Sequence, residues 1–192
     1  MIEYINKIIN EKNIDGYVIP KNDNYFTEYS NISYLQLATN FSGSAGFALI
    51  LKNKKYLFVD GRYTLQAKKQ CGNKFNILEI PFIWPKDLFK KINIKPNIGF
   101  DPNLFTYSIL NRYFENSCNL IPVSKKIFNN IDKKNLDSKK FFFLNKKVVG
   151  ESSNYKINRV LNVLSKKKIK HLFVSAGENV CWLLNIRGYD LP

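Results

Sequence analysis

The residues of this sequence that could carry out chemistry are few and scattered. Its three cysteines, Cys71, Cys118 and Cys181, form no CxxC pair, and His171 is the single histidine. A structural zinc site needs four ligands and a disulfide framework needs paired cysteines, so we interpret the cysteines as reduced and mostly buried. The sequence also lacks the HExxH, GxSxG and GxxxxGK[ST] patterns of common hydrolases and nucleotide-binding enzymes. It therefore holds no complete catalytic set.

One charged residue, Arg62, is notable for its position. The chain has 26 lysines but only four arginines, and this one follows an apolar run and a glycine in the segment VDGRY. A side chain at such a strand-to-helix junction lies at the rim of an α/β sheet, where a guanidinium can bind a carboxylate or a carbonyl through fork-like hydrogen bonds. The alternative is that Arg62 pairs with Asp60 or caps a neighbouring loop. The sequence leaves both interpretations open.

The formal net charge of +15 raises the question of nucleic-acid binding. The lysines are spread from Lys7 to Lys170, and most aromatic residues lie inside apolar runs instead of between the charges. Arginine, which makes the fork-like contacts to phosphates and bases, is scarce. We therefore expect no specific nucleic-acid site. A free-standing basic α/β binding module, for example one that binds RNA, remains the alternative function.

The distribution of apolar residues argues against a membrane protein. No apolar run approaches the roughly 18 residues that a membrane-spanning helix needs. The first 13 residues alternate isoleucine with polar residues at helical spacing, unlike the apolar centre of a signal peptide. With 45% hydrophobic and 15% aromatic residues, the chain is expected to be folded, cytoplasmic and not bound to a membrane.

Hydrophobic periodicity predicts alternating strands and helices over residues 1–124. The expected helices are 1–12, 61–70, 84–93 and 102–116, and the expected strands are 14–20, 47–51, 56–60, 75–81, 97–101 and 118–123. A short polar turn joins the second and third strands, which predicts an antiparallel hairpin. Residues 21–40 are interpreted as irregular, and the small residues of FSGSAG (41–46) as a tight turn. This alternation is typical of an α/β domain with a mixed sheet flanked by helices.

A second segment follows these strands and helices. Residues 125–147 are polar and charged, as in a linker. From residue 148 the pattern restarts with a helix capped by Ser152 or Ser153, a strand over 171–175 and a helix that ends at Gly188. One strand and two helices cannot close a core. We therefore expect residues 148–192 to be the start of a second, truncated domain of the same kind.

Six stretches of the chain, in order, resemble the amino-terminal region of aminopeptidase P (Xaa-Pro aminopeptidase), of the creatinase/prolidase family. They are DGYVIP at 15–20, TEY at 27–29, FSGSAG at 41–46, VDGRYTLQA at 59–67, GESSNYKI at 150–157 and NVCWLLNIRGYDLP at 179–192. The resemblance spans essentially the whole chain. It implies creatinase-type α/β domains that precede a catalytic domain with two divalent metals, usually manganese.

The resemblance also implies a function for the parent enzyme, which removes the first residue of peptides that have proline second. The family's metal ligands, two Asp, one His and two Glu, cannot be assigned in this sequence. The chain is therefore expected to hold no catalytic residue, metal or cofactor and to be inactive alone. It is expected to contribute to substrate access and to a homodimer.

The resemblance singles out two residues as contacts for the peptide substrate. It places the DGRY segment near the mouth of the catalytic cleft, where Arg62 could touch substrate. Glu28, in TEY, is the second candidate because an acidic group near the substrate's free amino terminus is electrostatically favourable. The alternative for Glu28 is an ordinary carboxylate on the surface.

Overall fold

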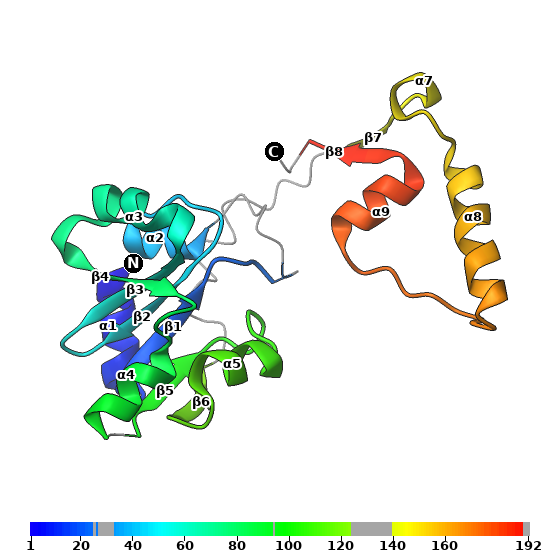
Figure 1. Ribbon diagram of the computed structural model, residues 1–192. Coiled ribbons are helices and arrows are strands. Elements are labelled where there is room, and N and C mark those ends of the chain that lie inside the picture. The colour runs from blue at the N-terminus through cyan, green and yellow to red at the C-terminus, as the bar shows by residue number, and fades with distance from the viewer. Residues whose placement is uncertain (25, 27–32, 94, 124–139, 190–192) are drawn as a thin grey trace. The chain divides into compact units, whose positions relative to one another are not determined.

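The computed structural model describes residues 1–24, 26, 33–93, 95–123 and 140–189 (Figure 1). The chain separates into two compact units, unit 1 (Met1–Asn135) and unit 2 (Leu136–Pro192). Within the described residues, no helix combines the length and the apolar character that crossing a bilayer requires.

Unit 1 is built around a mixed sheet. Its strands are β1 (Gly16–Pro20), β2 (Phe47–Leu51), β3 (Lys55–Asp60), β4 (Asn76–Ile80), β5 (Asn97–Phe100) and β6 (Asn119–Pro122). The order in this six-stranded sheet is β4-β3-β2-β1-β5-β6, and only β2 runs against its neighbours. The carboxyl ends of the other five strands therefore lie at one edge, which we call the carboxyl edge. The predicted α/β fold with a mixed sheet is confirmed, as is the β2–β3 hairpin.

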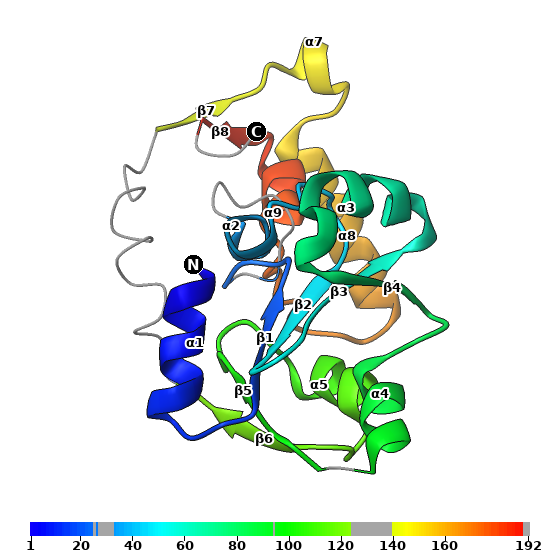
Figure 2. The same cartoon turned by 90° about the vertical axis from the view of Figure 1, so that its left-hand side faces the viewer.

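Helices cover both faces of this sheet. They are α1 (Ile2–Glu11), α2 (Tyr34–Thr39), α3 (Thr64–Cys71), α4 (Pro85–Ile92) and α5 (Tyr107–Phe114). Figure 2 shows α1 on one side of the sheet and α4 and α5 on the other. The side that α1 presents to the sheet carries the buried residues Ile5, Ile8 and Ile9, which are the apolar positions that predicted this helix.

The prediction that residues 21–40 are irregular is wrong in part, because helix α2 lies within them. The Ser33 hydroxyl accepts a hydrogen bond from the Gln36 backbone at 3.2 Å and so caps the helix. Leu35 and Ala38 are buried. At only six residues, α2 is too short for its apolar spacing to be distinguished from that of an irregular segment.

Aromatic rings fill the space between the sheet and helices α4 and α5. Phe47 on β2 stacks on Phe58 of β3, with 4.6 Å between the ring centroids, and on Tyr113 of α5, with 3.9 Å. Trp84, which precedes α4, lies 5.7 Å from Tyr113. Burial raises the pKa of Tyr113 to about 12. These rings fix the helices to the hairpin, because buried aromatic side chains dominate the energetics of a core.

The described part of unit 2 has a smaller set of elements. They are β7 (Phe141–Phe143), α7 (Lys146–Val149), α8 (Ser153–Lys166), α9 (Gly177–Leu184) and β8 (Ile186–Gly188), and β7 pairs antiparallel with β8. The predicted cap of α8 is confirmed, because the Ser152 hydroxyl accepts from the Tyr155 backbone at 3.3 Å. β7 lies within the span 125–147 that was predicted as a linker. Three consecutive phenylalanines favour a strand there.

Two local predictions for unit 2 are wrong. Residues 171–175 were predicted as a strand, but they form none and pair with no described strand. The last helix was predicted to end at Gly188, but it ends at Leu184, and β8 follows. The residue that caps it, Asn185, has a left-handed φ of 57°. Asparagine tolerates this conformation better than most residues, so it can end a helix as glycine does.

A polar network joins the helices of unit 2. Lys156 on α8 is 3% exposed, and its Nζ donates to the Trp182 carbonyl at 2.8 Å and to Asn185 Oδ1 at 2.7 Å. The ammonium lies 4.5 Å from the centroid of the Trp182 ring. Asn185 Nδ2 in turn donates to the Glu151 carbonyl at 2.9 Å. The network ties the start of α8 to the end of α9.

Candidate functional site

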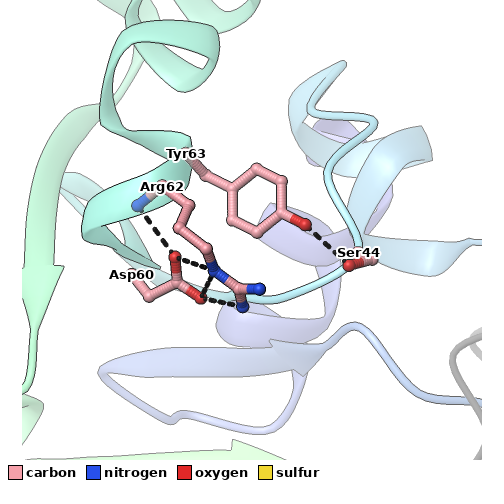
Figure 3. Close-up of polar contacts among 4 residues, drawn as sticks. All are labelled: Ser44, Asp60, Arg62 and Tyr63. Atoms are coloured by element: carbon pink, nitrogen blue, oxygen red, sulfur yellow. Dashed lines mark hydrogen bonds and ion pairs between the residues drawn. The ribbon is translucent and has the colours of Figure 1, made fainter.

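Arg62 lies at the carboxyl edge, two residues after the end of β3 (Figure 3). Asp60 is the last residue of that strand. Its Oδ1 accepts the Arg62 backbone N–H at 2.9 Å and so caps the short 3-10 helix η1 (Gly61–Tyr63). The same carboxylate accepts Arg62 Nε at 3.1 Å and Nη2 at 2.7 Å. Asp60 thus fixes both the backbone conformation and the side-chain orientation of Arg62.

The ion pair is strongly oriented but lies at the surface. Hydrogen bonds from Arg62 lower the pKa of Asp60 below its usual value, because they favour the ionised carboxylate. The Arg62 side chain is 75% exposed, and exposed pairs contribute only about 0–1 kcal/mol to stability. The pairing with Asp60 that the sequence offered as one alternative is therefore present. The guanidinium nevertheless remains accessible to a ligand in solution.

The aromatic residue after Arg62 connects this turn to the FSGSAG loop. The Tyr63 hydroxyl lies 2.8 Å from Ser44 Oγ (Figure 3). Its ring packs edge-on against Phe41, with 5.8 Å between centroids. Arg62 Cζ lies over the Tyr63 ring, 5.3 Å from its centroid. Tyr63 thus supports the arginine while it holds the loop that precedes β2.

The FSGSAG loop is also fixed to α3. Ser42 Oγ accepts from Gln66 Nε2 at 3.0 Å and from Gln70 Nε2 at 2.8 Å, and its backbone N–H donates to Gln70 Oε1 at 2.9 Å. Gly46 has a φ of 149°, and a Cβ there would lie 2.7 Å from the Phe58 carbonyl oxygen. Only glycine fits that position. The loop is a tight backbone turn, as predicted.

Sequence reasoning did not single out Ser44 or Tyr63 as parts of this site. The signal that could have found them is the hairpin, in which Phe47 of β2 pairs with Phe58 of β3. In an antiparallel pair, the residues before one strand lie beside the residues after the other. The loop at 41–46 therefore had to lie next to the turn that carries Arg62.

The remaining candidates do not join this site. Glu28 lies outside the described residues. Cys71 and Cys118 are buried and free, as predicted, and burial raises the pKa of Cys118 to about 12. His171 is exposed.

Among the described residues, no group of three or more His, Cys, Asp and Glu side chains could hold a metal ion, so they do not fit a centre for two divalent metals.

Comparison with known proteins identifies the family. A family model of the creatinase/prolidase N-terminal domain matches residues 1–131, and a second model of the same description matches residues 132–192. The chain belongs to the creatinase/prolidase N-terminal domain family. This confirms the resemblance seen in the sequence.

Curated relatives in this family are considerably longer than the chain. It is 28% identical over 200 residues to probable Xaa-Pro aminopeptidase P from Coprinopsis cinerea, with 97% of this chain and 32% of the relative covered. It is 26% identical over 210 residues to Xaa-Pro aminopeptidase 1 from Dictyostelium discoideum, with 99% and 34% covered. The chain thus spans about a third of the length of these creatinase/prolidase relatives.

Solved structures of the family agree with the fold. X-prolyl aminopeptidase from Caenorhabditis elegans, described as a cytosolic enzyme with a di-nuclear active site, matches with a TM-score of 0.75 and 25% identity. The match covers 93% of this chain and 31% of that enzyme. The N-terminal domain of the cytoplasmic peptidase PepQ from Mycobacterium tuberculosis matches 67% of this chain and 95% of its own, with a TM-score of 0.52 and 18% identity. This second likeness concerns the fold alone.

Proposed function

We propose that this chain forms the N-terminal, non-catalytic part of a metal-dependent Xaa-Pro aminopeptidase and contributes to substrate access. The observation that carries the proposal is the match to the C. elegans X-prolyl aminopeptidase, which extends over 93% of this chain but 31% of that enzyme. We expect the 192-residue chain to be inactive alone and the parent enzyme to be a homodimer.

Within this function, Arg62 is the residue through which we expect unit 1 to contact the peptide. Its guanidinium carries five N–H donors in a rigid fork, and Asp60 orients that fork through Nε and Nη2. The exposed side chain can reach a carboxylate or a carbonyl of the substrate. Because the arginine is already oriented, binding costs less side-chain entropy than it would for a mobile residue.

The test uses a full-length relative, such as the D. discoideum enzyme, in which this chain replaces the matching N-terminal region. A charge-assisted hydrogen bond contributes about 1.5–3 kcal/mol, so Arg62→Ala should lower kcat/KM for an Xaa-Pro peptide by about tenfold or more. The content of bound metal should not change. Arg62→Lys should recover only part of the loss, because an ammonium cannot form the fork.

A matched control separates a substrate contact from a supporting role. Arg112 is an exposed arginine on α5 of the same unit, so Arg112→Ala removes the same charge at another place. We expect the control to retain its kcat/KM. If Arg62→Ala left the kinetics unchanged and lowered only the melting temperature of the isolated chain, Arg62 would be part of the scaffold and this assignment would be wrong.

A further inference from the structure

The edge of the unit 1 sheet opposite the carboxyl edge carries a row of lysines. We call it the amino edge, because β1, β3, β4, β5 and β6 begin there and the turn between β2 and β3 lies there as well. Its lysines are Lys12 after α1, Lys52, Lys54 and Lys55 around the β2–β3 turn, Lys74 before β4 and Lys95 before β5. The fold thus brings to one edge lysines that lie far apart in the sequence.

Hydrogen bonds between the loops hold these segments side by side. The Asp15 N–H donates to the Asn97 carbonyl at 2.8 Å, and the Asp15 carbonyl accepts the Lys52 N–H at 3.3 Å. Further along the edge, Asn76 Nδ2 donates to the Lys55 carbonyl at 3.2 Å. Neighbouring strands lie about 4.8 Å apart, so the four steps from β4 to β5 place the lysines along a row of about 19 Å.

The carboxylates of the amino edge are already paired. Asp15 Oδ1 lies 3.7 Å from Lys52 Nζ. Glu11 pairs with a lysine of α1, and Glu115 pairs with two lysines of α4. Within the part of the chain that the structure describes, the other five lysines of this edge form no ion pair, and we call them the edge lysines: Lys12, Lys54, Lys55, Lys74 and Lys95. Their positive charge is therefore available to a partner.

The carboxyl edge differs in charge from the amino edge. Three carboxylates lie there, Asp60 and Glu79 on β3 and β4 and Asp101 directly after β5, and they offset the charge of Arg62. Unpaired positive charge is thus concentrated on the side of the sheet that lies away from the candidate site.

The side chains between the edge lysines indicate the chemistry of the partner. Exposed asparagines lie in the same loops, and their amides can donate hydrogen bonds to phosphate oxygens. They are Asn13, Asn53, Asn73 and Asn116. No arginine lies in the described segments of this edge, so the direct reading of bases, which favours arginine, is not expected. The edge therefore fits a phosphate backbone and not a particular base sequence.

Large apolar side chains are not exposed in the described segments of the amino edge. Those that unit 1 exposes lie in other segments and are Tyr4, Phe26, Leu37, Leu65, Phe82 and Tyr107. A helix that binds at a bilayer surface inserts apolar residues beside its basic ones, and proteins that bind single strands stack the bases on aromatic rings. The amino edge offers neither feature, which favours a duplex, because its bases are already stacked on one another.

We propose that the amino edge of unit 1 binds the phosphate backbone of double-stranded nucleic acid without sequence preference. A duplex carries one negative charge per about 1.7 Å of its axis, so it presents roughly ten phosphates over the length of the row. The edge lysines replace counterions on these phosphates, and the release of the counterions drives binding. The interaction is separate from peptide binding, because Arg62 lies at the opposite edge of the sheet.

The salt dependence of binding to a labelled DNA duplex of about 24 base pairs tests the proposal on the 192-residue chain. The logarithm of the association constant should fall linearly with the logarithm of the salt concentration, with a slope of about −0.9 for each phosphate contacted. Five edge lysines therefore predict a slope of about −4 to −4.5 between about 50 and 200 mM salt. Two duplexes of unrelated sequence should bind equally. Tighter binding of single-stranded DNA than of the duplex would overturn the proposal.

A triple variant locates the site on the amino edge. Lys12→Gln, Lys54→Gln and Lys74→Gln together remove three charges from exposed side chains that lie outside the strands. The slope should become less negative by about 2.7, and binding at about 0.1 M salt should weaken at least tenfold. The midpoint of urea unfolding should not change, because substitutions of exposed side chains have small effects on stability.

A second triple variant is the matched control. Lys166→Gln, Lys167→Gln and Lys170→Gln remove the same charge from exposed side chains of unit 2 and should leave slope and affinity unchanged. An equal loss in both variants, a loss in the control alone, or no binding of the unsubstituted chain at about 50 mM salt would overturn the proposal. Vesicles that contain phosphatidylserine distinguish the remaining source of phosphate: binding to them and not to the duplex would contradict it as well.

Discussion

β1 in unit 1 and residues 171–175 in unit 2 follow the same type of helix ending, yet only the first is a strand. Both helices end in a Schellman motif, in which the Ile14 N–H donates to the Ile9 carbonyl and the Ile169 N–H to the Leu164 carbonyl. The helix and this ending depend on contacts within about a dozen residues, and they form in both units. The strand depends on neighbours that are distant in the sequence, and only unit 1 provides them. The comparison teaches that local sequence can prepare an apolar segment for a sheet without forming the sheet.

The two units also differ in the interactions that hold them together. Unit 1 has a continuous apolar core in which aromatic rings such as Phe47 and Phe58 stack across the hairpin. In the described part of unit 2, the buried ammonium of Lys156 and its two carbonyl acceptors connect α8 to α9. The chain carries one tryptophan in each unit, Trp84 and Trp182, so the unfolding of each can be followed separately in variants that retain only one.

The largest effect is expected from placing a lysine at matched positions of the two segments. Val18 is buried on β1, which lies between β2 and β5. Val18→Lys puts an unpaired ammonium into this core, and we expect it to destabilise unit 1 by more than about 4 kcal/mol. Phe173→Lys should change the stability of unit 2 by no more than about 0.5 kcal/mol, because that side chain is in solvent. Urea unfolding followed by Trp84 or Trp182 fluorescence measures both. If both substitutions lowered the unfolding free energy by similar amounts, the two segments would not differ in burial as described.

A smaller effect is expected at the two asparagines that end α2 and α9. Both adopt left-handed conformations, which glycine accepts. Asn185→Gly removes the side-chain bonds to Lys156 and Glu151 and should cost unit 2 about 1–3 kcal/mol. Asn40 is exposed, so Asn40→Gly should stay within about 0.5 kcal/mol. Equal costs in urea unfolding would mean that the polar network does not support unit 2.

The smallest effect is expected when the pH is lowered and Asp60, at the carboxyl edge of unit 1, takes up a proton. Because Arg62 lowers the pKa of Asp60, the pair stabilises the folded state above the unfolded pKa of about 3.9. This contribution is lost as the pH falls through the lower pKa of the folded state. For an exposed pair it should be below about 1 kcal/mol. The measurement is the difference in unfolding free energy between the chain and Asp60→Asn, which should shrink as the pH falls below 4.

The fold of unit 1 could be predicted from the sequence because its strands are short apolar runs separated by clear turns. FALIL and YLFVD, joined by four polar residues, could only be a hairpin. α2 was missed because six residues give too little periodicity. The strand predicted at 171–175 was wrong for a different reason. Its composition is that of a strand, but composition does not reveal whether a neighbouring strand is present.

The candidate site could be predicted only in part. The isolated position of Arg62 after an apolar run and a glycine identified it, and Asp60 was named as its alternative partner. The supporting contacts between Tyr63 and Ser44, and between Ser42 and Gln70, could not be read from the sequence. They join residues 19 and 28 positions apart, and they depend on how the hairpin brings the loop to the turn.

Amide hydrogen exchange of the unmodified 192-residue chain tests the central comparison most directly. The amides of residues 17–19 should exchange only through global unfolding of unit 1, because β1 is buried and paired on both sides. The amides of residues 172–174 should exchange at nearly the rate of an unfolded peptide. Comparable protection of the two segments in dilute solution would contradict the account, since residues 171–175 would then already be part of a sheet.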